Sequence, residues 1–169
     1  MANIDYSDFL SEGLTSFAQN DFANSISNFT KALNETPNSK LAIVSRGAAY
    51  LQHKRIAEAI ADFDRAIEID RAYARAYHLR GLAREKQGND HEALEDFDKA
   101  LTINPDYGAA YKSRASLYYK MNKPEEGMED VKMTAYLTNR DLEIFGNAHN
   151  ILRTLHLRVE DMEETELNR

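Results

Sequence analysis

The chain has 169 residues, of which 43% are hydrophobic and 29% are charged, and its formal net charge is −7 at pH 7. This composition is that of a soluble globular protein, and the acidic balance argues against nucleic acid as a partner, because phosphate binding needs a concentrated basic face. The N-terminus has neither the basic region nor the apolar segment of a signal peptide, and no long apolar run is present, so we expect a cytoplasmic protein without a membrane partner. The absence of cysteine excludes disulfides and thiolate chemistry.

A pattern of residues recurs every 34 positions along most of the chain. Its centre is a glycine at Gly13, Gly47 and Gly81, with Ala115 in the fourth place. The flanking positions hold an aromatic or aliphatic residue, a small residue and then a second large one: Phe9, Ile43, Tyr77 and Tyr111; Ser25, Ala59, Ala93 and Gly127; Phe29, Phe63, Phe97 and Val131. The pattern fills 6–39, 40–73, 74–107 and 108–141 without an insertion or deletion. We therefore predict a stacked array that forms one domain over residues 1–169.

The spacing within the third copy predicts two helices joined by a tight turn. Tyr77 and Gly81 share one face of the first helix, and Ala93 and Phe97 share one face of the second. Gly88 lies in the break between them and suits a positive φ. Each copy is thus predicted to be a helical hairpin.

These residues resemble the tetratricopeptide repeat (TPR), whose signature runs W-x2-L-G-x2-Y, then A-x3-F, then P. The resemblance covers residues 6–141 and is strong in the second and third copies. The first copy lacks the early Tyr, at Ser16, and the fourth lacks both Gly and Pro, with Asn139 in the place of Pro105. The resemblance implies an all-α, right-handed α-solenoid of four helical hairpins, whose first helices line a concave surface.

Beyond the array, residues 142–163 are predicted to form one more helix, which Thr138 or Asn139 can cap at its start. Its apolar residues alternate spacings of three and four in a heptad-like seam over 145–162: Phe145, Ala148, Leu152, Leu155, Val159 and Met162. The acidic tail, 164–169, should fray. We expect this helix to cap the fourth repeat, since arrays need a covered end. The alternative is that the seam pairs with a second copy of the chain.

No group of residues in the sequence suggests catalysis or metal binding. None of the five histidines lies three or four residues from another, the spacing of a helical metal pair: His53, His78, His91, His149 and His156. No nucleophile motif, glycine-rich phosphate loop or CxxC is present. We expect a protein that is not an enzyme and that holds neither cofactor nor metal.

A charged pair also recurs with the repeat. Arginines precede the central glycine or its equivalent, and aspartates follow sixteen residues later: Arg46, Arg80 and Arg114; Asp62, Asp96 and Asp130. In the first copy both members change together, to Glu12 and Asn28. Because the acid accompanies the base, we predict ion pairs between the two helices of a hairpin rather than a row of arginines for an anionic ligand.

A second stripe on the first helices is not required for packing within the hairpin. In chain order it reads Leu10, Leu14 and Phe17; Val44, Ala48 and Leu51; His78, Leu82 and Glu85; Lys112, Ser116 and Tyr119, with Leu41, Arg75, Lys86 and Lys120 beside it. The resemblance implies that this stripe faces the concave groove, which would be apolar toward the N-terminus and basic toward the C-terminus. Such a strip is a mark of a peptide-binding surface. In the other interpretation, Leu10, Leu14 and Phe17 thicken the interior of the first repeat.

TPR grooves that hold the C-terminus of a heat-shock chaperone use a carboxylate clamp of Lys, Asn and Arg. The corresponding residues in this chain are Leu10, Leu14, Ser45, Arg75 and Leu79. Only Arg75 fits, so a co-chaperone function of that kind is not expected.

We therefore expect an adaptor or scaffold that binds a short amphipathic segment of a partner protein, with apolar anchors toward Leu14, Phe17 and Leu51. Acidic residues of that segment would lie toward Arg75, Lys112 and Lys120. One alternative is a small TPR chaperone that shields an apolar segment of a client. The other is a self-assembling scaffold, a homo-oligomer joined through the groove or the seam.

Overall fold

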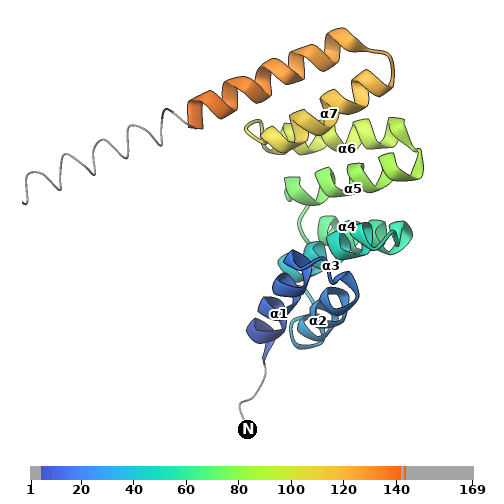
Figure 1. The fold of residues 1–169 in the computed structure, drawn as a ribbon, viewed down its shortest axis with the longest axis vertical. Helices are drawn as coiled ribbons and strands as arrows, with labels where there is room; N and C mark the ends of the chain where they lie inside the picture. Colours follow the sequence, from blue (N-terminus) through green and yellow to red (C-terminus); the bar gives the residue numbers. More distant parts are fainter. Residues whose placement is uncertain (1–4, 142, 144–169) are drawn as a thin grey trace, which may run out of the picture.

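The computed structural model of the protein describes residues 5–141 and residue 143. Its helices, with one further helical segment at 124–141, are α1 (Tyr6–Ala18), α2 (Phe22–Glu35), α3 (Lys40–Gln52), α4 (Ile56–Ile69), α5 (Ala74–Gln87), α6 (Asp90–Ile103) and α7 (Gly108–Lys120). Neighbours in the chain are neighbours in space, and the hairpins stack in chain order from one end of the molecule to the other (Figure 1). The prediction of an all-α array of four hairpins is confirmed.

The central glycine sets the distance between the two helices of a hairpin. A Cβ atom built on Gly13, Gly47 or Gly81 would lie 2.6 Å from the Cε1 atom of the phenylalanine sixteen residues later. Those rings, Phe29, Phe63 and Phe97, are fully buried. The recurring glycine is thus explained by a close helix crossing that a larger side chain would push apart.

Each hairpin turn contains one residue with a positive φ at the same place in the repeat. These residues are Asn20, Lys54, Gly88 and Asn122, with φ of 61°, 64°, 88° and 59°. The prediction for Gly88 is confirmed. The other copies place a non-glycine residue in the left-handed region, which asparagine tolerates better than lysine.

Side chains cap the starts of the helices at the N-terminal end of the array. Asp5 accepts hydrogen bonds from the backbone of Ser7 and Asp8, and the Asp8 side chain accepts one from the backbone of Asp5 in return. The Asp21 side chain caps α2 by accepting a hydrogen bond from the backbone of Asn24, and the Ser39 side chain caps α3 by accepting one from the backbone of Ala42. These bonds satisfy N–H groups that have no partner within the helix.

The second helix of one repeat packs against the first helix of the next. Phe29 of α2 lies in a cluster with Ala49 of α3. Two repeats later, Leu94 and Phe97 of α6 pack with Leu117 of α7. The core is therefore a continuous layer between successive helices rather than one central body, as expected of a stacked array.

The fourth repeat departs from the sequence prediction at its end. Thr138 and Asn139 lie inside the helix at 124–141, so neither caps a new helix. The corresponding residues of earlier repeats include Pro37 and Pro105, which cannot continue a helix, whereas Asn139 can. The predicted helix 142–163 falls outside the described residues except at residue 143, which is helical.

Candidate functional site

The recurring arginines form ion pairs between the helices of their own hairpins. Arg80 donates from Nε to Asp96 at 3.0 Å and from Nη2 at 2.6 Å, and Arg46 and Arg114 bind Asp62 and Asp130 in the same two-bonded way. The aspartates are buried. The prediction of structural ion pairs is confirmed.

Each of these arginines also contacts the preceding repeat, which the sequence analysis missed. Arg80 donates to Asp64 at 2.6 Å and Arg114 to Asp98 at 2.6 Å. Burial acts against the charge of the Arg80 guanidinium, but its bonds to Asp96 and Asp64 outweigh this and raise its pKa. The signal was present in the sequence, because Asp62 and Asp96 each begin an Asp-Phe-Asp triplet. These arginines therefore join neighbouring repeats, because each bonds both within its own hairpin and to the preceding one.

The first helices of the first, second and fourth repeats expose several large apolar side chains. Leu14 of α1 is 47% exposed and Leu41 of α3 is 42% exposed, and Tyr119 of α7 is also exposed. Leu10 and Phe17 are half-buried, and the Phe17 ring lies edge-on to Phe22 with centroids 5.5 Å apart. Part of the predicted apolar strip is thus free and part is packed.

Three residues of the predicted groove are instead buried. Val44 is 0%, Leu51 is 5% and His78 is 6% exposed. They lie on α3 and α5, which have a neighbouring first helix on both sides, so the stripe on these helices is packed between neighbours. The prediction that these side chains are available to a ligand is corrected accordingly. Ala48 and Leu82 are half-buried.

A cleft between α5 and α7 brings together much of the remaining stripe. It has a volume of about 380 Å³ and is lined by His78, Leu82 and Glu85 of α5 and by Ala109, Lys112, Ser113 and Ser116 of α7. Lys112 and Ser116 are exposed, and Leu82 supplies an apolar wall. The cleft therefore offers an acid, a base, hydroxyl groups and a small apolar surface.

The wall of this cleft is fixed by a buried histidine. The His78 ring nitrogens lie 3.1 Å from the Tyr107 hydroxyl oxygen and 2.9 Å from the Ser113 hydroxyl oxygen. Burial, and then the positive charge of Arg75, lower the pKa of His78 to about 4. The imidazole is therefore neutral at pH 7, when one ring nitrogen donates and the other accepts. These two hydroxyl partners were not predicted from the sequence: Tyr107 is the last residue of the same repeat, and Ser113 belongs to the next one.

The predicted basic residues beside the stripe differ in their surroundings. Arg75 is exposed and lines a second cleft of about 270 Å³ with Tyr73 and Tyr107. Lys120 instead pairs with Asp90, with Nζ and Oδ1 2.6 Å apart. Lys120 is therefore a weaker candidate for binding an acidic ligand than Arg75.

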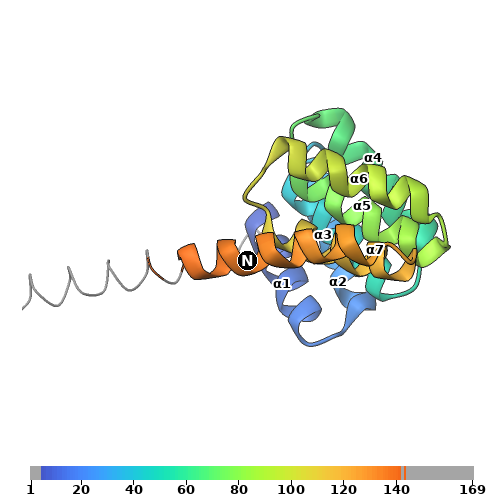
Figure 2. The same cartoon turned by 90° about the horizontal axis from the view of Figure 1, so that it is seen from above.

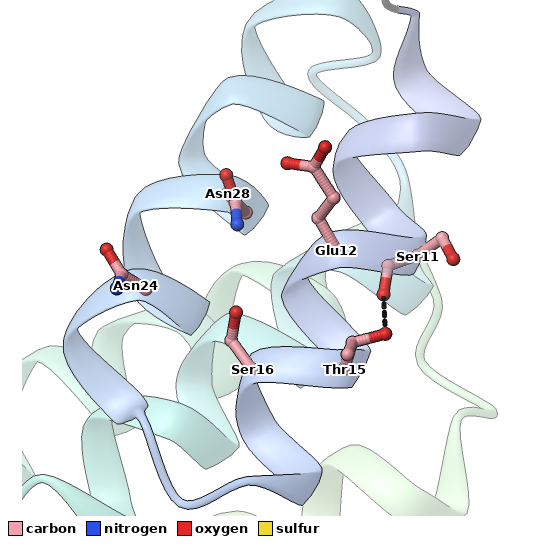
Figure 3. A pocket seen from close by; sticks show the side chains of 6 residues that line it. All are labelled: Ser11, Glu12, Thr15, Ser16, Asn24 and Asn28. Carbon is pink, nitrogen blue, oxygen red and sulfur yellow. Dashed lines mark hydrogen bonds between the residues drawn. The ribbon is translucent and has the colours of Figure 1, made fainter.

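The first hairpin has a polar hollow of about 340 Å³ in place of the Arg–Asp pair. Figure 3 shows its lining, which includes Glu12, Ser16 and Asn28 in the positions that hold Arg46, Tyr50 and Asp62 in the second repeat. Smaller or shorter side chains leave this space open. It is explained by the atypical composition of a terminal repeat.

Neither a metal site nor a membrane span emerges within the described residues. No three His, Asp or Glu side chains there are grouped to hold a metal ion. In the same part of the chain, no helix combines the length and the apolar character that a bilayer crossing requires.

Comparison with known proteins identifies the repeat in the middle of the chain. A sequence model described as TPR repeat matches residues 47–88, and one described as Tetratricopeptide repeat matches residues 74–107. No curated protein matches the sequence.

Several solved structures share the fold. MamA from Desulfovibrio magneticus RS-1 has a TM-score of 0.71 and 21% identity, over 80% of this chain and 77% of that one. The first TPR of Spaghetti (RPAP3) bound to the HSP90 peptide SRMEEVD has a TM-score of 0.65 and 24% identity, over 70% and 94%. The Sgt2 TPR domain from Aspergillus fumigatus has a TM-score of 0.66 and 23% identity, over 73% and 83%. The sequence models show that residues 47–107 of the chain are tetratricopeptide repeats, and the solved structures show that the chain shares the fold of TPR domains.

Proposed function

We propose that the chain is a non-catalytic interaction module whose first helices hold a short amphipathic segment of a partner protein. The observation that carries the proposal is the exposure of large apolar side chains on these helices. Leu14, Leu41 and Tyr119 all remain exposed on the first helices. Exposed apolar side chains of this size favour a binding surface.

The cleft between α5 and α7 supports an amphipathic ligand rather than a purely apolar one. Leu82 can contact a methylene stem, while Lys112 can pair with an acidic group and Ser116 can donate or accept a hydrogen bond. Glu85 on the opposite wall disfavours a second acid at the same point. The groove thus suits a segment with apolar anchors and a single acidic residue near Lys112.

The ligand is not expected to be gripped by a terminal carboxylate. The RPAP3 domain is described with the HSP90 peptide SRMEEVD. In the present chain the five positions of a carboxylate clamp hold Leu10, Leu14, Ser45, Arg75 and Leu79. Ser45 is buried and the leucines cannot bind a carboxylate, so Arg75 alone remains of the clamp. An internal segment held by side-chain contacts fits these residues better.

Selection from a displayed library of random 12-residue peptides tests the proposal. The parent should enrich peptides that combine apolar residues with an acid. Affinities of the enriched peptides are then compared with a groove variant, Leu14→Lys with Leu41→Lys, which alters two exposed side chains. Loss of an apolar anchor at a hot spot costs about 2 kcal/mol, or about 30-fold in Kd, so the variant should bind at least that much more weakly.

A matched control changes exposed apolar residues of second helices. Ile69→Lys with Met133→Lys adds the same charge at positions of similar exposure. It should keep the affinity of the parent. Equal losses in the two variants, or a library that yields no binder, would refute the assignment of the first helices as the binding surface.

A further inference from the structure

One end of the array presents an uncovered apolar surface. Met128 and Val131, on the helix at 124–141, are 48% and 44% exposed, and Ala135 is exposed beside them. Their spacing of three and four residues places them on one side of the helix. We name these three residues the end face. This helix is the last element of the stack in Figures 1 and 2.

The same positions are covered in every earlier repeat. Leu94 and Phe97, which lie 34 residues before Met128 and Val131, pack with Leu117 of α7. The residue 34 before Ala135 is Leu101, which is likewise buried in a cluster with α7. The end face therefore lies at the positions that pack against the first helix of the next repeat elsewhere in the array, so it is suited to pack against a helix.

The chain does not turn back at the point where earlier repeats do. Four residues separate α2 from α3, and four separate α6 from α7. The corresponding residues of the fourth repeat, 138–141, are helical, and so is residue 143. The chain therefore continues as a helix beyond the end face, instead of turning back to pack against it as the first helix of a further repeat would.

The N-terminal end of a second copy is not suited to cover the end face in a head-to-tail stack. In the inner repeats, Ala42 and Ala49 of α3 face the preceding hairpin and are fully buried. Asp8 and Thr15 replace them in α1 and are exposed. Placing Asp8 against Met128 and Val131 would take its carboxylate out of water with only one backbone hydrogen bond, from Asp5, and without a cation, which is unfavourable.

We propose that the end face is covered by the end face of a second copy of this chain. Two such helices, antiparallel about a twofold axis near Val131, set Met128 of each copy against Ala135 of the other. Glu129 and Lys132, which pair within one chain at 2.7 Å, would also lie close to each other across the axis. The contact is self-complementary in shape and charge, as a twofold interface requires.

The sequence provides for an interface longer than these three residues. A stable dimer buries about 800 Å² per partner, more than three side chains supply. In the sequence, the spacing of Met128, Val131 and Ala135 continues through the polar Thr138 to the apolar Leu142 and Phe145. This inference is independent of the proposed peptide-binding surface.

Light scattering on the full chain tests the proposal directly. The parent should have twice the chain mass of 19.3 kDa at micromolar concentration and dissociate on dilution. Met128→Glu with Val131→Glu should have the mass of one chain. The control Met133→Glu with Tyr136→Glu alters exposed apolar residues elsewhere on the same helix and should remain dimeric.

Two outcomes would overturn the proposal. A dimer that survives Met128→Glu with Val131→Glu would be joined through another surface. A parent that stays at 19.3 kDa at all concentrations would leave the end face to residues 144–163 of the same chain. In that case the double variant should lower the Tm well below that of the control.

The absence of cysteine allows a second test of the twofold geometry. Val131→Cys places the only thiol of each chain next to the axis. It should crosslink under mild oxidation, because two thiols close to a twofold axis can reach disulfide distance. Tyr136→Cys, at a more exposed position of the same helix, should remain uncrosslinked at the same concentration. Faster crosslinking at position 136 would contradict the proposed face.

Discussion

At the scale of single residues, the array depends on side chains that fix how closely the helices approach. Gly81 allows contact between α5 and Phe97 of α6, and a Cβ atom there would also meet the Ala93 carbonyl oxygen at 3.1 Å. Gly108, at the start of α7, has only Leu137 within reach of a Cβ atom, at 3.9 Å. The helix crossing therefore requires glycine at position 81 but not at position 108, and only Gly81 is one of the recurring glycines.

Substitutions at these two glycines should have different effects on the free energy of unfolding. Gly81→Leu should lower the free energy of unfolding by about 1–3 kcal/mol or more, because the added side chain has no room beside Phe97. Gly108→Ala should be neutral or raise it by about 0.5 kcal/mol, since it reduces the freedom of the unfolded chain. Urea denaturation measures both. Equal effects would show that the helix crossing has been misplaced.

The Arg80–Asp96 pair should show strong energetic coupling. Asp96→Ala should cost about 3–5 kcal/mol, because it leaves two partly buried guanidinium groups, Arg80 and Arg84, without this acid. Exposed Glu95→Ala should change stability by no more than about 0.5 kcal/mol. In a double-mutant cycle, Arg80→Ala should be less harmful once Asp96 is removed. Additive effects would mean that the two residues do not interact in solution.

His78 should make stability depend on pH between about 4 and 6.5. The unfolded chain binds a proton near pH 6.5, but the folded chain does so only near pH 4, because the imidazole is buried. The unfolded state thus holds more protons in this window, so the free energy of unfolding falls as pH falls, by about 3 kcal/mol in all.

Chemical denaturation between pH 5 and 7 would measure this slope. His78→Gln should flatten it, while His53→Gln, at an exposed position, should retain it. The upper part of the window is chosen because the lowered pKa values of Asp70 and Glu58 affect stability at more acidic pH. An unchanged slope in His78→Gln would place the titrating group elsewhere.

At the scale of helices, the position of a first helix in the array decides whether its stripe is exposed. Leu51 and Val44 belong to α3, which has first helices on both sides, whereas Leu14 belongs to terminal α1. The sequence period alone could not reveal this, because it makes the copies equivalent. It predicted the hairpins and the Arg46–Asp62 type of pair, since those contacts lie within one copy.

Contacts that cross from one repeat to the next were harder to predict. The bond from His78 to Ser113 joins residues whose sequence positions carry no shared pattern of change, whereas the bond from Arg114 to Asp98 had a sequence signal only in the repeated Asp-Phe-Asp triplet. The continuation of the last helix was missed for a related reason. Loss of proline at Asn139 permits a helix but does not demand one.

Lysine substitutions should distinguish the two environments of the stripe. Leu14→Lys should leave the Tm nearly unchanged, because the charge remains in water. Leu51→Lys should destabilise the protein by about 3 kcal/mol or more, since it buries an unpaired charge beside α5. Thermal melts of the two variants provide the comparison. A Leu51→Lys variant that folds with an unchanged Tm would show that Leu51 is exposed in the groove.

At the scale of the whole molecule, the array separates its possible contacts by surface. The first helices supply the proposed peptide-binding surface, the Arg–Asp pairs join the repeats, and the end face lies on the last helix. A chain organised in this way can bind a segment and a second copy at once, because Leu14 and Val131 belong to the first and last hairpins of the array.

The most direct test of the central claim is an NMR titration of the labelled protein with a library-selected peptide. Shifts of backbone amide signals should concentrate on α1, α3, α5 and α7, with large changes at Leu14, Leu41, Lys112 and Ser116. The second helices and the end face should change little. Shifts confined to α2, α4 and α6, or to residues around Val131, would contradict the assignment of the first helices as the binding surface.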